Sequence, residues 1–182
     1  MLDVPAAGVV AVDDAACAGG AVFVDTNEVE FFLVGVKDAA GGKGDRAGQD
    51  DAAEELGGGN DVLAIQSDVT MLSNEEHAVD RILEKWGRLD VVLANAGVGH
   101  FAPIDEMKQQ HWHNMINTNL NGVYHTLKAS VQALKKSKGY LITLASLAGT
   151  NFFAQGAGYN ASKFGLVGFT QAAMLDLRPY DI

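Results

Sequence analysis

The chain has 182 residues, of which 48% are hydrophobic and 20% charged. This composition predicts one globular domain spanning residues 1–182 and excludes a disordered or fibrous protein. Because 13 basic residues stand against 23 acidic ones, for a net charge of −10, we expect no nucleic-acid or membrane partner, and a small-molecule function fits better.

The first 60 residues give the weakest pattern. Short strands are expected at residues 8–12 and 29–36, where apolar and β-branched residues gather. A crossover helix is expected over residues 13–27, although a glycine pair and a β-prone run inside it make it a poor helix. Residues 38–60 are rich in Gly, Ala and Asp and predict a loop, with at best a short helix at 50–56.

From residue 61 onward strands and helices alternate, which is typical of a parallel sheet with helices on its faces. Residues 61–66 predict a strand. Ser73-Asn74-Glu75-Glu76 matches a capping box, and apolar residues then recur at helical spacing until Gly87, which is expected to end the helix. Residues 89–94 predict the next strand.

Two long helices and one strand complete the chain. The first helix is expected over residues 106–138, with apolar positions three or four apart, lysines near its end and Gly139 as its stop. Residues 140–145 are apolar nearly throughout, as in a strand covered on both faces. The second helix is expected over residues 159–177, because Pro179 pushes its predecessor out of helical geometry.

The most informative pair of residues is Tyr159-x-x-x-Lys163, at the start of the second helix. This spacing places both side chains on one helix face, so the ammonium lies beside the phenol and favours its ionised form. Such a pair makes an acid/base from a group that otherwise ionises near pH ~10. Alone, the spacing also fits a solvated helix face. Ser146 follows the strand 140–145 and stands thirteen residues before Tyr159.

Four motifs follow one another on the expected elements. They are Asn95-Ala96-Gly97 after one strand, Asn119-Leu120-Asn121-Gly122 in the next helix, Ser146 after the following strand, and Tyr159-x-x-x-Lys163. With this order the chain resembles the short-chain dehydrogenase/reductase family from about residue 61 to its end. The resemblance implies a Rossmann-type, doubly wound parallel sheet in an α/β fold with three α/β/α layers, and binding of NAD(H) or NADP(H).

The resemblance also implies an enzyme that interconverts a ketone and a secondary alcohol. Tyr159 would give a proton to the carbonyl oxygen as hydride arrives, or remove it in the oxidative direction. Lys163 would favour the tyrosinate and bond the nicotinamide ribose. Ser146 would hold and polarise the carbonyl oxygen. Asn119 would loosen its helix and hold a water that relays protons to Lys163. A functional role is favoured because a polar Asn inside a long helix is locally unfavourable.

The resemblance implies cofactor-binding residues on two further segments. The turn of Asn95, Ala96 and Gly97 would lie along the cofactor, where small residues allow close backbone approach. Asp68 and Val69 match the family's acidic-apolar pair that meets the adenine ring. Both segments also fit ordinary turn chemistry after a strand, and Ser146 also fits a plain cap serine.

Residues 12–20 depart from the family, whose first strand is followed by a TGxxxGxG turn that closes around the pyrophosphate. Only Gly20 matches, and two carboxylates would face the phosphate. Two interpretations stay open: tight cofactor binding is lost, or residues 1–60 are not the biological sequence, as a reading-frame error would give. Lys37 would pair with a 2′-phosphate and favours NADP, whereas Asp38 favours NAD.

The family continues past Ile182 with further strands and a segment that covers the substrate. We therefore treat the chain as a fragment lacking the family's last strands, and expect residues 140–145 to form an exposed apolar sheet edge. The resemblance implies that the two long helices pair between subunits, giving a homo-oligomer (dimer or tetramer). One alternative is a non-catalytic member that keeps this oligomer surface and has lost the cofactor site; another acts on acyl-thioester or sugar-nucleotide carbonyls.

Other residues carry weaker expectations. Cys17 is the only cysteine, which excludes an internal disulfide, indicates a reducing compartment and favours a buried thiol over a nucleophile. The first 36 residues hold no Lys or Arg, so a signal or transit peptide is not expected and the sequence predicts a cytoplasmic protein. His111 and His113 are expected at the surface, with no metal site.

Overall fold

The computed structural model describes residues 20–25, 30–35 and 62–182. Five strands form one sheet in the order β3-β1-β2-β4-β5. The strands are β1 (Gly20–Asp25), β2 (Glu30–Gly35), β3 (Val62–Gln66), β4 (Val91–Ala94) and β5 (Tyr140–Thr143). The helices are α2 (Leu72–Trp86), α3 (Gln109–Ile116), the π-helix η2 (Asn117–Gly122), α4 (Val123–Ser137), the 3₁₀ turn η3 (Leu147–Gly149), α5 (Ala157–Leu177) and the 3₁₀ turn η4 (Arg178–Tyr180).

The sheet is parallel except for one strand. β2 pairs with β4 and β4 with β5 in parallel, whereas β1 is antiparallel to both β2 and β3. The strand expected at 29–36 is confirmed by β2. The crossover helix expected over 13–27 is wrong where β1 lies, because the Ala-Val-Phe-Val run of this strand prefers extended backbone and its glycine disfavours helix.

Several expectations fall outside the described residues. They are the strand at 8–12, the loop over 38–60 with its short helix at 50–56, and the side chains of Cys17, Lys37 and Asp38. From residue 62 onward every expected strand and helix is present, so the α/β architecture is confirmed there.

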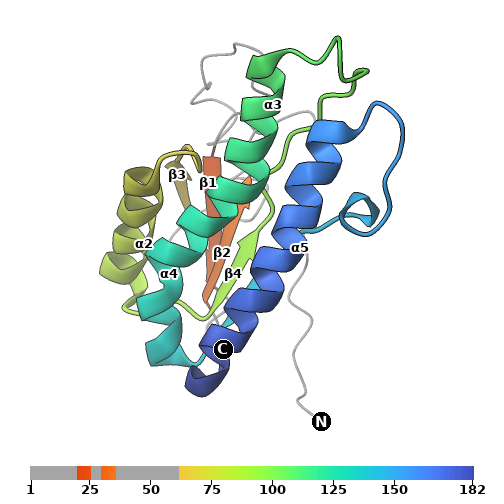
Figure 1. The fold of residues 1–182 in the computed structure, drawn as a ribbon. Coiled ribbons are helices and arrows are strands. Elements are labelled where there is room, and N and C mark those ends of the chain that lie inside the picture. Colours follow the sequence, from red (N-terminus) through yellow and green to blue (C-terminus); the bar gives the residue numbers. More distant parts are fainter. Residues whose placement is uncertain (1–19, 26–29, 36–61) are drawn as a thin grey trace.

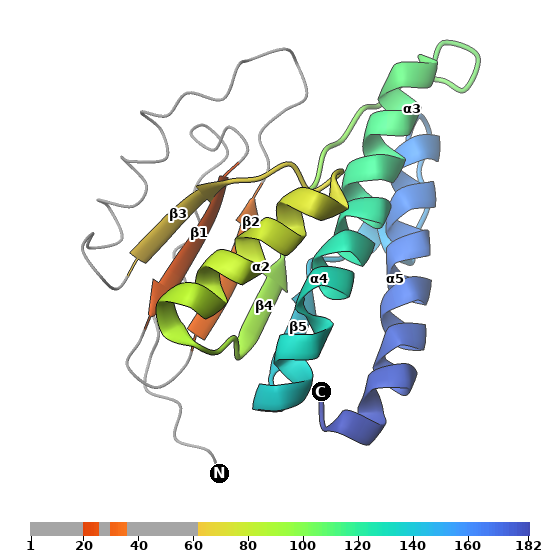
Figure 2. The same ribbon diagram turned by 90° about the vertical axis from the view of Figure 1, so that its left-hand side faces the viewer.

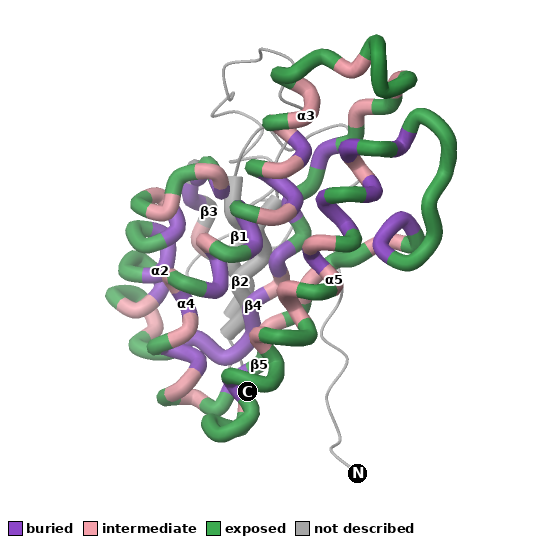
Figure 3. The backbone as a smooth tube through the Cα atoms, viewed as in Figure 1, coloured by how far each residue is buried: buried purple, intermediate pink, exposed green. Residues whose placement is uncertain are grey.

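Helices α2, α4 and α5 cover one face of the sheet (Figures 1 and 2). The main core lies between this helical layer and the strands, and Figure 3 shows buried residues on the inward sides of α2 and α4. The described elements form two layers, the sheet and this layer of helices; the second helical layer of the expected three is not among them. The core includes Val79, Ile82, Leu89, Val92 and Leu134. No described helix has both the length and the apolarity to span a membrane.

Helix α2 begins differently from the capping-box expectation. Met71 is its N-cap and makes no side-chain cap hydrogen bond, so Ser73 lies inside the helix. Glu75 is fully buried and accepts hydrogen bonds from Ser67 Oγ and Thr126 Oγ1, both at 2.7 Å. The capping box is therefore wrong, because the buried carboxylate joins α2 to α4. The stop at Gly87 is confirmed by its left-handed φ of 76°.

The expected helix over 106–138 is continuous from α3 through η2 to α4, beginning at Gln109. Its left-handed C-cap is Lys138, with φ 56°, and not the expected Gly139. Gly139 is required for packing, because a Cβ there would overlap the main-chain carbonyl oxygen of Asp90. β5 lies at the edge of the sheet formed by the described strands, as expected. Its alternate residues Tyr140 and Ile142 are 61% and 48% exposed, so the expectation of a strand covered on both faces is wrong for one face.

Candidate active site

A buried asparagine joins the loop after β4 to helix α5. Asn119 lies in η2, and its side chain is fully buried. Its Oδ1 accepts a hydrogen bond from Val98 N at 2.8 Å, and its Nδ2 donates to Val98 O and to Ser162 Oγ, both at 2.9 Å. The wider π turn at this residue agrees with a locally loosened helix. Its expected water stays a prediction.

Lys163 is a buried lysine whose ammonium donates a hydrogen bond to a main-chain carbonyl. It is 5% exposed, and its Nζ donates to Leu144 O at 2.9 Å. Burial lowers the pKa of Lys163, because desolvation disfavours the ammonium. Since an ammonium has three N–H groups and Leu144 accepts one, two are left for hydroxyl or anionic groups of a ligand.

The turn after β4 reaches this lysine. A Cβ added at Gly97 would lie 3.5 Å from Asn119 Oδ1 and 3.8 Å from Lys163 Nζ. Gly97 and Asn95 are exposed, whereas Ala96 is packed in the main core. The structure thus brings the expected cofactor turn beside two of the expected catalytic residues, with the open side of Gly97 facing them.

Tyr159 lies in the first turn of α5 and is half-buried. Lys163 Nζ is 5.8 Å from the centroid of its ring, so the pair lies on one face of the helix, as the four-residue spacing predicts. Ser162 Oγ donates to Tyr159 O at 2.8 Å and accepts from Asn119. This hydrogen-bond chain connects the first turn of α5 to η2.

Ser146 is the N-cap of η3 and is half-buried. Its Oγ accepts a hydrogen bond from Ala148 N at 3.1 Å, which fixes the side chain and leaves the hydroxyl proton free to be donated. η3 is held on α5, because Asn160 Nδ2 donates to Ala148 O at 2.8 Å and a Cβ at Gly149 would be 2.8 Å from Lys163 O.

In the turn between β3 and α2, the side chain of Asp68 is exposed and that of Val69 is buried. Asp68 is exposed, and its Oδ1 accepts hydrogen bonds from Thr70 N and Oγ1 at 2.9 and 2.7 Å. Val69 is 1% exposed, and a Cβ at Gly122 would lie 2.8 Å from its Cγ2. The side chain of Val69 therefore belongs to the core, and that of Asp68 is the one a ligand can reach.

Two predicted cofactor residues are not brought to this site by the described structure. Gly20 is the first residue of β1 and pairs with Gly35 and Gln66 within the sheet. It therefore does not lie in a turn that precedes a helix. Lys37 lies outside the described residues.

The histidines behave differently from one another. His113 is exposed, as expected, but His111 is half-buried and stacks on His100 with ring centroids 4.1 Å apart. Within the described ranges no three side chains of His, Cys, Asp or Glu gather as metal ligands would.

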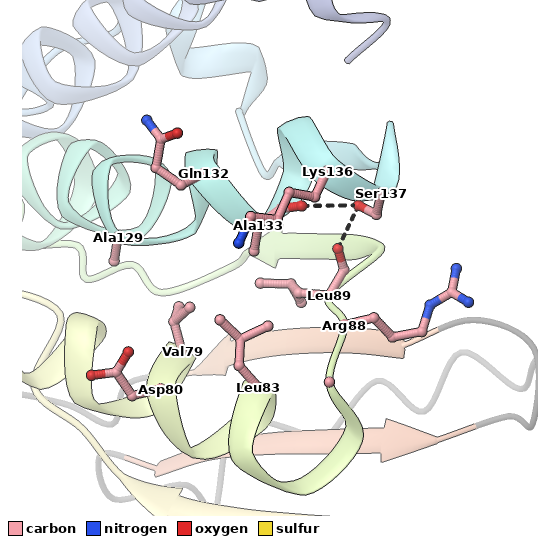
Figure 4. Close-up of a pocket in the computed structure, with 11 residues that line it drawn as sticks. Val79, Asp80, Leu83, Arg88, Leu89, Ala129, Gln132, Ala133, Lys136 and Ser137 are labelled. Atoms are coloured by element: carbon pink, nitrogen blue, oxygen red, sulfur yellow. Dashed lines mark hydrogen bonds between the residues drawn. The ribbon is translucent and has the colours of Figure 1, made fainter.

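A pocket of about 660 Å³ lies between the C-terminal halves of α2 and α4 (Figure 4), and none of the expected site residues lines it.

Sequence reasoning missed two buried residues next to Tyr159. Asn160 is 7% exposed and holds the β5–α5 loop, and Ser162 is fully buried between Asn119 and α5. The sequence indicates them only by their polarity at the start of a helix that is otherwise largely apolar, since polar side chains at such positions form hydrogen bonds to nearby backbone groups.

Comparison with known proteins agrees with this arrangement. The family model described as short chain dehydrogenase matches residues 37–182. Trans-4-hydroxycyclohexanecarboxylate dehydrogenase of Sinomonas cyclohexanicum is 35% identical over 125 residues, which are 68% of this chain and 48% of that protein. The chain thus spans about half the length of this relative.

Two solved structures are also similar. One is an alcohol dehydrogenase of the archaeon Thermococcus sibiricus complexed with 5-hydroxy-NADP, with a TM-score of 0.65 and 29% identity over 71% of this chain and 55% of that one. The other is an NAD⁺-bound xylitol dehydrogenase, with a TM-score of 0.69 and 26% identity over 82% of this chain and 57% of that one. The chain belongs to the short chain dehydrogenase family.

Proposed function

We propose that this chain carries the reaction site of an NAD(P)(H)-dependent oxidoreductase that interconverts a ketone and a secondary alcohol. The observation that carries the proposal is a buried lysine beside a tyrosine and an open glycine turn, at Lys163, Tyr159 and Gly97. The similar proteins are named as dehydrogenases, and the two solved ones hold an NADP derivative or NAD⁺, so both cofactors stay candidates.

Tyr159 is the acid and base of the proposed reaction. In reduction the Tyr159 hydroxyl gives its proton to the carbonyl oxygen, and in oxidation the tyrosinate takes it back. The Lys163 ammonium stabilises the tyrosinate through its charge, and a negative phenolate in turn compensates the buried ammonium. The free proton of Ser146 Oγ is donated to the same substrate oxygen and stabilises the charge that develops there.

The residues present fit a nicotinamide dinucleotide on this side of the sheet. The two remaining N–H groups of Lys163 suit ribose hydroxyls, and Gly97 leaves room for the cofactor beside them. Asn95 and Ala96 shape the same turn. Asp68 offers an exposed carboxylate to the adenine amino group, with the main chain of Val69 beside it. When bound, the nicotinamide supplies or accepts the hydride.

Replacing the proton donor tests this function. Tyr159→Phe removes only the hydroxyl, so turnover of a secondary alcohol with NAD⁺ or NADP⁺ is expected to fall at least ~10²-fold while binding of the dinucleotide persists. Tyr124→Phe, which removes a hydroxyl from an exposed tyrosine on α4, is the matched control and should keep full activity. Equal activity of the two variants would refute the mechanism.

The second candidate is a non-catalytic family member that forms oligomers. Two observations favour it: Gly20 lies in a strand, and the two long helices expose large apolar side chains. The exposed residues are Tyr124, Phe164, Met174 and Leu175. Micromolar dinucleotide binding, followed by tryptophan fluorescence, supports the enzyme; no response at millimolar levels, with a dimer in light scattering, supports the second candidate.

A further inference from the structure

Three aromatic rings meet beside the proposed proton donor. The Phe101 ring lies 5.6 Å from the Tyr159 ring in an edge-on arrangement and 5.8 Å from the Phe153 ring, centroid to centroid. These three residues are called the aromatic shelf below. Phe101 comes from the loop after β4, Phe153 from the loop between β5 and α5, and both remain about half exposed, at 55% and 48%.

Two glycines make room for the shelf. A Cβ at Gly99 would lie 3.1 Å from the Phe101 ring and 3.7 Å from the Tyr159 ring, so the absence of a side chain lets these rings approach each other. A Cβ at Gly156 would lie 2.5 Å from the Phe153 ring. A side chain at Gly156 would therefore displace the Phe153 ring, and one at Gly99 would require the Phe101 ring to shift by a few tenths of an ångström.

The two loops that carry the phenylalanines are fixed to each other. Ala102 N donates a hydrogen bond to Gln155 O at 3.0 Å. Asn160 Nδ2 donates to Asn151 O at 2.8 Å, and its Oδ1 accepts from Phe153 N at 3.4 Å. These hydrogen bonds hold the two loops together, while the side chains of Phe101 and Phe153 stay about half exposed to solvent.

Apart from Lys163, whose Nζ is 5.8 Å from the centroid of the Tyr159 ring, the surroundings of the shelf are largely apolar. The described segments 97–104 and 144–158 contain no Asp, Glu, Lys or Arg. They expose further large apolar side chains, at Ile104 (70%), Leu147 (81%) and Phe152 (87%). Apolar surface gathered around a reactive polar group is typical of a ligand site.

We propose that the aromatic shelf binds the apolar substituent of the substrate, which makes Phe101 and Phe153 specificity-determining residues. The substrate class is then uncharged ketones and secondary alcohols with a cyclic or aromatic group next to the reacting carbon. Substrates with a phosphate, nucleotide or carboxylate at this place find no cation in either segment. The proposal rests on the proposed function, because Tyr159 supplies both the reacting hydroxyl and one ring of the shelf.

The test compares two alcohols that share the reacting group, 1-phenylethanol and 2-propanol, with the full chain and each of NAD⁺ and NADP⁺. Phe101→Ala and Phe153→Ala are each expected to lower kcat/KM for 1-phenylethanol about tenfold, and for 2-propanol no more than about twofold. Phe164→Ala, which removes a 44% exposed ring on α5 outside the shelf, is the control and should change neither value. Equal losses on both alcohols would overturn the proposal.

A binding measurement separates failure of the shelf from failure of the reaction. Saturation-transfer NMR with acetophenone is expected to show contact with the wild-type chain and a loss of that contact in Phe101→Ala. If no alcohol is turned over but this contact depends on Phe101, the proposed function fails and the shelf stands. Contact that is unchanged in both Phe101→Ala and Phe153→Ala overturns the shelf.

Discussion

Asn119→Asp is the sharpest perturbation of the site, because it changes one group at the junction of three segments. The amide N–H₂ donates to Val98 O and Ser162 Oγ, and a carboxylate of the same shape has no proton to donate. Val98 O then faces an oxygen in a fully buried position. One unsatisfied buried carbonyl and one lost hydrogen bond together predict a loss of about 2–4 kcal/mol in the free energy of unfolding.

Urea unfolding at neutral pH measures this loss, with Asn121→Asp as the matched control. Asn121 lies in the same π turn, but it is exposed and its amide bonds only Asn117 Oδ1 at 3.0 Å, so its replacement should cost no more than about 0.5 kcal/mol. At acid pH the introduced carboxyl regains a proton that it can donate, and the difference between the two variants should narrow.

The same two variants provide a functional readout. Because Asn119 fastens the loop that carries Gly97 to α5, Asn119→Asp is also expected to weaken dinucleotide binding, whereas Asn121→Asp is not. The reasoning is refuted if the two variants unfold at the same urea concentration, since the amide of Asn119 would then contribute nothing that an exposed amide lacks.

Three further predictions test packing and charge. Burial raises the pKa of Glu75 above its ordinary value of 4.5, so the folded chain keeps that proton to higher pH than the unfolded chain. The free energy of unfolding should therefore fall as pH rises from 4.5 through the folded pKa, by about 1.4 kcal/mol for each unit by which the pKa is raised. In urea unfolding across that pH range, Glu75→Gln should remove this fall. Identical pH profiles would contradict this. Gly139→Ala should lower the free energy of unfolding by about 1–3 kcal/mol, because its Cβ would overlap a backbone carbonyl. Gly168→Ala, whose Cβ would have nothing within 4 Å, should raise it by up to about 1 kcal/mol. Thermal unfolding distinguishes the two variants, and equal shifts in Tm would contradict the overlap at Gly139. In Gly122→Ala the new Cβ would lie 2.8 Å from Val69 Cγ2 and displace the turn that holds Asp68 and Val69. The Kd for the dinucleotide, measured by isothermal titration, should rise about tenfold. An unchanged Kd would contradict a role of this turn in cofactor binding.

The sequence by itself determined the elements from residue 62 onward. Their apolar periodicity, the stop at Gly87 and the end of α5 at Leu177 depend on residues close together in the chain, and each is present in the structure. The expected loss of helical geometry before Pro179 is wrong, because Arg178 keeps helical backbone angles of φ −49° and ψ −39° and begins the turn η4. Family membership followed in the same way, because the spacing of Tyr159 and Lys163 and the order of the motifs can be counted along the chain.

Tertiary structure decided what depends on distant partners. The direction of β1 is set by pairing with β2 and β3, and Glu75 is a buried carboxylate because Ser67 and Thr126 reach it from elsewhere. The partners of Asn119 and the meeting of Phe101 with Phe153 likewise join residues far apart in the sequence. Local propensity cannot specify such contacts, because they form only when packing the core brings separate segments together and their burial outweighs the entropy of ordering them.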